Sequence, residues 1–125
     1  MLELVRLCKK WNNVKNAKTI PSYMLETMIV SYADSVSELS QWIDFRFRDT
    51  LEYIADHITG PVYDMKGIQG DINHLGVSDR WSLQCKARAD YEKACEAWQE
   101  EQAKNYKGAI SKWGEIFGSS FPEYG

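Results

Sequence analysis

Cysteine and histidine are scarce in this sequence, which has 125 residues but only 3 cysteines and 2 histidines. The cysteines, Cys8, Cys85 and Cys95, are odd in number and form neither a CxxC pair nor any other spacing typical of metal ligands. A disulfide framework and a zinc site are therefore both unfavourable interpretations. We predict a reducing, intracellular environment.

Long hydrophobic runs are also missing. No apolar stretch approaches the roughly 20 residues that a membrane-spanning helix needs, and the opening MLELVRLCKK lacks the apolar core of a signal peptide. We expect a cytoplasmic protein with no membrane partner. The net charge of −3 argues against a general nucleic-acid coat, which needs a broad excess of Lys and Arg. Any anion-binding site must be local.

Groups that could support catalysis are equally sparse. The sequence contains no DxD pair, the arrangement by which closely spaced carboxylates hold catalytic metal ions. His57 and His74 have no neighbour at a spacing that suggests a ligand pair or a nucleophile relay. We therefore assign no catalytic residue and no metal ligand in this chain.

Apolar residues recur at helical intervals along most of residues 1–125, which predicts a single all-α domain, a bundle of about four to five helices. The first helix is expected over residues 2–13, with an apolar stripe formed by Leu4, Leu7, Cys8 and Trp11. A second is expected to begin at Pro21, a residue favoured in the first turn. Its buried face would consist of Met24, Leu25, Met28, Ile29 and Tyr32.

A third helix is expected to begin at a Ser35 or Ser37 cap and to end near Thr59, before Gly60-Pro61. Its apolar positions are Leu39, Trp42, Ile43, Phe47, Leu51, Ile54, Ala55 and Ile58. The following stretch, GPVYDMKGIQGDINHLGVSD, is rich in glycine and is expected to be one long irregular loop.

A long final helix is expected after this loop, capped by Ser78 or Asp79. Any division of this helix is expected at Gly108, and its end at Gly118 and Pro122. One face would hold Ala87, Tyr91, Ala94, Cys95 and Trp98. No alternating pattern indicates a sheet.

Basic residues gather near the start of the chain, where no acidic residue occurs between Leu4 and Leu25. Arg6, Lys9 and Lys10 fall on one side of the first expected helix, which suits either a polyphosphate or plain solvation. Ser22 and Tyr23 leave two interpretations open as well. A helix start with a hydroxyl can receive a phosphate while the ring stacks on a base, or Tyr23 can simply pack.

Four segments, in their order along the chain, carry a family resemblance. They are LVRLCKKWNN, TIPSYMLETMIVSYAD, GPVYDMKGIQGDIN and AISKWGEIFGSSFP. The first two resemble the L-x-R-L-x-K-x-W helix and the P-[SPQ]-Y-x-L-E helix that open the C-terminal helical lobe of 2′-5′-oligoadenylate synthetases and their cyclic GMP-AMP synthase and bacterial cyclic-oligonucleotide synthase relatives. The third is similar to the family's P-V-x-D-P…G-N loop. The fourth resembles an ending common in the bacterial members, and favours the anti-phage signalling branch.

The resemblance implies a nucleotide-binding role for matching residues. In that family the helical lobe faces a catalytic nucleotidyltransferase lobe across a cleft. Lys9 would contact the triphosphate of a nucleotide such as ATP or GTP, Ser22 would hydrogen-bond to it, and Tyr23 would stack on the base. Arg6 and Lys10 would be auxiliary.

The sequence departs from the family in two ways. Met65 replaces the usual proline of the loop, and extra residues precede Asn73, so the loop's part in closing the cleft stays unassigned. The family's G-[GS]…D-x-D lobe is absent, so the chain resembles about the last third of such an enzyme. We expect no activity from it alone and no cofactor in this chain, with Mg²⁺ and a nucleoside triphosphate required by the full enzyme. Its partner would be the N-terminal nucleotidyltransferase lobe, and the apolar face meant for that lobe would favour self-association.

A non-catalytic helical interaction module is the alternative. In this hypothesis the tryptophans serve core and partner packing, because Trp is often an interface anchor. They are Trp11, Trp42, Trp81, Trp98 and Trp113.

Overall fold

The computed structural model describes residues 2–13, 19–36, 43–64 and 67–117. These residues form five helices and no strand: α1 (Leu2–Asn12), α2 (Ser22–Ser35), α3 (Ile43–His57), α4 (Val77–Gln102) and α5 (Tyr106–Phe117). The all-α prediction is confirmed. No helix in these ranges is both long enough and apolar enough to cross a lipid bilayer.

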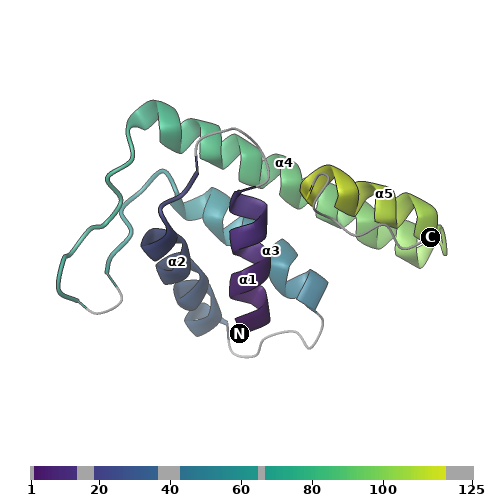
Figure 1. Ribbon diagram of the computed structural model, residues 1–125, viewed down its shortest axis with the longest axis horizontal. Helices are drawn as coiled ribbons and strands as arrows, with labels where there is room; N and C mark the ends of the chain where they lie inside the picture. The colour runs from purple at the N-terminus through teal and green to yellow at the C-terminus, as the bar shows by residue number, and fades with distance from the viewer. Residues whose placement is uncertain (1, 14–18, 37–42, 65–66, 118–125) are drawn as a thin grey trace.

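The helix α4 runs along the length of the molecule (Figure 1). Its 26 residues correspond to about 39 Å of helix. The shorter α5 lies beside the C-terminal part of α4, and α1, α2 and α3 lie on one side of it (Figure 1). The loop between α3 and α4 extends at the end of the molecule far from α5. The face of α4 that packs is a repeat of mostly small residues: Leu83, Ala87, Asp90, Ala94 and Ala97.

The core draws on the predicted faces of α1 and α2. Leu4, Cys8 and Trp11 are fully buried, whereas Leu7 is only partly buried at the edge of the core. All five apolar residues expected to be buried in α2 are in the core: Met24, Leu25, Met28, Ile29 and Tyr32. Trp11 also ties α1 to α4, because its Nε1 donates a hydrogen bond to the buried Asp90 Oδ2 at 2.7 Å.

Several predicted helix ends are wrong. Ser35 is the last residue of α2 rather than a cap of α3, and its hydroxyl donates to the Tyr32 carbonyl at 2.7 Å. The helix α4 begins one residue before Ser78, with Gly76 at the N-cap and no side-chain capping bond there. Some residues named in the predictions lie outside the described residues: Ser37, Leu39, Trp42, Met65, Gly118 and Pro122.

The division of the last helix falls at Ala103–Asn105, before the expected Gly108. Asn105 explains this position, because its Oδ1 accepts the Gly108 backbone N–H at 3.2 Å and so caps the start of α5. Gly108 itself lies inside α5, where an added Cβ would be 2.7 Å from Asn105 Nδ2. The predicted face of α4 is rotated as well, since Trp98 is 38% exposed while Asp90 is buried.

Candidate nucleotide-binding surface

Lys9 of α1 reaches across to α2. Its Nζ lies 2.6 Å from Glu26 Oε1, with the two side chains 44% and 36% exposed. Arg6 and Lys10 are also exposed on α1, one helical turn apart from each other. The basic face of α1 is thus at the surface, and one of its residues is fixed against the second predicted helix.

Ser22 and Tyr23 belong to the same part of α2 as Glu26. Residues three and four apart lie on one face of a helix, so Glu26 is one turn from both. Ser22 is exposed at the first position of α2, where Pro21 provides no side-chain capping bond. Early backbone N–H groups of a helix have no partner within that helix, and they carry a partial positive charge. The ion pair therefore brings the lysine and the helix start onto one surface.

The ion pair with Glu26 is weak enough for Lys9 to exchange it for a more highly charged partner. An ion pair between exposed groups contributes only about 0.2–1 kcal/mol to stability. A triphosphate carries several negative charges and can replace the single carboxylate of Glu26 at little cost to the fold. Arg6 and Lys10 add positive charge within the range at which screening in salt is incomplete, about 8–10 Å.

Tyr23 is partly buried and its hydroxyl donates a hydrogen bond to Asp64 Oδ1, in the loop between α3 and α4. The hydrogen bond to this carboxylate is the main reason that the pKa of Tyr23 is raised, with desolvation adding to it. The phenol therefore stays protonated near neutral pH and acts as a donor. Tyr23 joins the helix start to the loop.

The loop is ordered at its base by side chains that bind backbone carbonyls. The buried Asn73 donates its Nδ2 to the carbonyls of Ile58 and Gly60, at 2.8 and 2.7 Å. Arg80 donates to the carbonyls of Leu75, Asn73 and Thr59 at 2.9, 2.8 and 3.1 Å. An isolated antiparallel bridge pairs Tyr63 with Asp71. The two flanks of the loop that was predicted to be irregular are thus joined by hydrogen bonds from Asn73 and Arg80.

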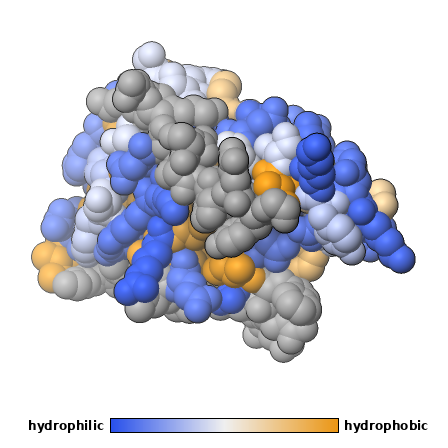
Figure 2. All heavy atoms as spheres, turned by 45° about the vertical axis from the view of Figure 1, so that its right-hand side comes forward, coloured by the Kyte–Doolittle hydropathy of each residue, from blue (hydrophilic) through white to orange (hydrophobic). Residues whose placement is uncertain are grey.

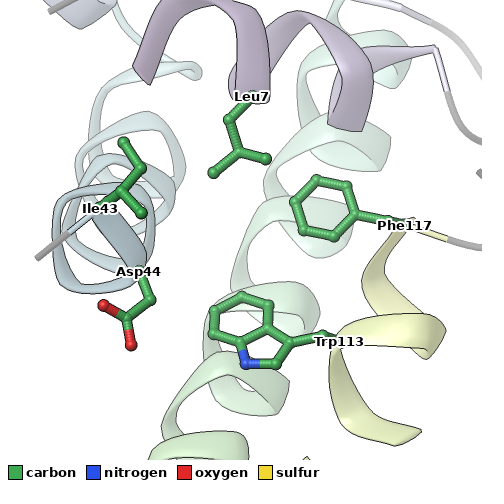
Figure 3. Close-up of a pocket in the computed structure, with 5 residues that line it drawn as sticks. All are labelled: Leu7, Ile43, Asp44, Trp113 and Phe117. Carbon is green, nitrogen blue, oxygen red and sulfur yellow. The ribbon is translucent and has the colours of Figure 1, made fainter. Parts of the chain in front are cut away.

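An apolar cavity of about 250 Å³ lies elsewhere, between α1, α3 and α5. Figure 3 shows its lining: Leu7, Ile43, Asp44, Trp113 and Phe117. The only charged group among these is the carboxylate of Asp44, which repels phosphate. This cavity therefore does not suit a triphosphate, and the Lys9 surface is the better candidate.

Two residues that contact Lys9 and Tyr23 are not predicted by the sequence pattern, namely Glu26 and Asp64. Glu26 is the glutamate of the P-[SPQ]-Y-x-L-E pattern, and its helical spacing from Ser22 and Tyr23 is the signal that could have placed it near them. Asp64 lies amid glycines 41 positions away from Tyr23. No local pattern indicates that contact, because it depends on how the loop folds back.

Metal binding finds no support in the described ranges, where no group of three or more His, Cys, Asp or Glu side chains is arranged to hold an ion. His57 is exposed and its Nδ1 lies 2.8 Å from the Tyr53 carbonyl, on whose ring it stacks.

The fold defines a helical domain in which Lys9 of α1 is paired with Glu26 of α2, one turn from the start of that helix. No protein-family model matches the chain. Over 99% of its length it is 32% identical to a probable cyclic nucleotide synthase of Bacillus cereus (strain VD146). The chain spans 37% of that relative's length. It is therefore a helical domain homologous to part of a probable bacterial cyclic nucleotide synthase.

Proposed function

We propose that this chain is the helical nucleotide-binding lobe of a cyclic-oligonucleotide synthase of anti-phage signalling. It positions a nucleoside triphosphate, ATP or GTP, for a catalytic nucleotidyltransferase lobe. The single observation that carries the proposal is the Lys9–Glu26 ion pair of 2.6 Å. Through it, two segments that resemble nucleotide-contacting parts of one enzyme family share a surface.

Each residue of the proposed site has a chemical role. Lys9 neutralises the triphosphate, Ser22 and the adjacent N–H groups of α2 hydrogen-bond to it, and the ring of Tyr23 stacks on the base. Arg6 and Lys10 supply long-range attraction. In nucleotidyl transfer, metal ions stabilise the attacking and leaving oxygens while positive side chains hold the triphosphate. This chain provides the second of these contributions.

Titration of the chain with ATP tests the site directly. We expect amide NMR shifts centred on Lys9, Ser22 and Tyr23. Lys9→Ala should bind ATP about 10- to 150-fold more weakly, because a charge-assisted contact is worth about 1.5–3 kcal/mol. Glu26→Gln removes the competing carboxylate and should bind ATP more tightly. Lys107→Ala changes an exposed lysine of α5 and serves as the matched control.

The outcome that contradicts the proposal is ATP binding that Lys9→Ala and Lys107→Ala affect equally, or no binding at all. A second assay addresses the synthase itself. With the nucleotidyltransferase lobe supplied in trans, or in a full-length chain, Mg²⁺-dependent nucleotide condensation should fall strongly in Lys9→Ala. Unchanged condensation would remove Lys9 from the site.

A further inference from the structure

The carboxylate of Asp64 joins two structures that the sequence keeps apart. Oδ1 accepts the hydroxyl of Tyr23 in α2. Oδ2 accepts the backbone N–H groups of Ile68 and Gln69 in the loop, at 3.2 and 3.1 Å. Asp64 is only 7% exposed. One buried side chain therefore organises the turn of the loop and binds the tip of the Tyr23 ring.

The position of this carboxylate is fixed by its own backbone. The Asp64 N–H donates to the Gly70 carbonyl at 2.7 Å, and the Asp64 carbonyl accepts the Gly67 N–H at 2.9 Å. Gly67 and Gly70 have φ angles of 69° and 70°, which glycine adopts without the strain of a side chain. Below them, Val62 and Ile72 are paired through an N–H to carbonyl bond of 2.7 Å. These backbone hydrogen bonds thus hold the side chain of Asp64 in a defined position.

A tyrosine ring moves through two torsions, and a hydrogen bond at its far end restrains both. Tyr23 is partly exposed although it packs against the core, and its hydroxyl is held by Asp64. A restrained ring loses less conformational entropy when a planar ligand stacks on it. Stacking on a base contributes about 1–3 kcal/mol, so ring orientation bears directly on nucleotide affinity.

We propose that Asp64 is a positioning residue, which holds the Tyr23 ring in the orientation that stacks on the nucleotide base. This inference rests on the proposed function, because it specifies how that site recognises a base. It gives the loop between α3 and α4 a definite role. Through Asp64, the loop supports the ring of Tyr23.

The variant Tyr23→Phe separates positioning from stacking. It keeps an aromatic ring and removes only the hydroxyl that Asp64 holds. Binding is measured by calorimetry with two probes, ATP and inorganic tripolyphosphate, which lacks a base. We expect ATP to bind about threefold to tenfold more weakly to Tyr23→Phe, while tripolyphosphate affinity is unchanged. Tyr63→Phe, a change at the exposed tyrosine beside Asp64, should alter neither.

Asp64→Asn gives the complementary measurement, since an amide cannot accept on both sides as a carboxylate does. Its ATP affinity should fall with tripolyphosphate affinity retained, which a general loss of folding would not produce. The inference is overturned if Tyr23→Phe binds ATP like the wild type while Lys9→Ala still weakens both probes; that result leaves the proposed function standing. Failure of the wild type to bind either probe would overturn both.

Discussion

At the scale of single residues, the three cysteines lie in different surroundings. Cys8 is buried, Cys85 is exposed and Cys95 is intermediate, all as free thiols. Burial raises the pKa of Cys8 from an ordinary 9.0 to about 12, because a thiolate is poorly solvated in the core. Native Cys8 should thus be inert to thiol reagents, which attack the thiolate.

The raised pKa of Cys8 also makes the free energy of unfolding depend on pH in the alkaline range. Between pH 9 and 12 the unfolded chain loses a proton that folded Cys8 retains, so the stabilisation present below pH 9 is lost as pH rises. The slope is about 1.4 kcal/mol per pH unit from this one group. Urea unfolding should show a steeper loss for the wild type than for Cys8→Ala between pH 9 and 11. Parallel curves would mean that Cys8 ionises equally in both states.

Residues whose role follows from local spacing were predictable, and those whose role needs a distant partner were not. The stripe of α1 identified Trp11 as a core residue. Its hydrogen bond to Asp90 joins positions 79 apart, and α4 gives no sign of it, because a buried carboxylate looks like any surface acid in a sequence. The same holds for Tyr23 and Asp64. The placement of Lys9 and Ser22 on one surface was expected from the resemblance alone.

At the scale of elements, the end of α4 and the start of α5 are both capped, and Asn105 takes part in both caps. The N–H of Lys104 bonds to the Glu101 carbonyl at 3.0 Å and that of Asn105 to the Glu100 carbonyl at 2.8 Å, as in a Schellman ending. Asn105 then caps α5. Glycine content suggested Gly108 as the break, but capping by asparagine decided the position. Helices were therefore predictable from periodicity, and their boundaries less so.

Lys104 adopts a φ of 61°, a conformation that costs a non-glycine residue about 1 kcal/mol. Lys104→Gly should therefore stabilise the protein by about 0.5–1 kcal/mol, measured as a higher urea midpoint. Lys107→Gly places the same residue in the first turn of α5 and should destabilise the protein by about 0.5–1 kcal/mol. A lower midpoint for Lys104→Gly would contradict this account of the junction.

At the scale of the whole molecule, apolar side chains remain at the surface of α4. Val77 and Trp81 are 73% and 60% exposed and lie one turn apart. Figure 2 shows one face of the molecule, on which hydrophobic surface appears in separate patches among hydrophilic side chains. The self-association expected from the sequence stays a prediction, and Val77 and Trp81 are exposed apolar residues at which it can be tested.

Sedimentation at rising concentration should reveal weak self-association of the chain, since exposed apolar side chains favour contacts between copies. Trp81→Glu should reduce it, because it removes apolar surface and introduces repulsion. Ser82→Glu adds the same charge at the next exposed residue of α4 and controls for net charge. A wild type that stays monomeric at all concentrations would refute the expectation.

The guanidinium of Arg80 has one more consequence. It binds carbonyls on both flanks of the loop, at Thr59 before it and at Asn73 and Leu75 after it. Arg80 therefore joins the two ends of the loop. The entropic cost of closing a loop grows only slowly with its length, so a longer or shorter loop would change this cost little. Insertions or deletions within the loop should therefore leave the helices in place, and those that displace Asp64 would in addition remove its contact with Tyr23.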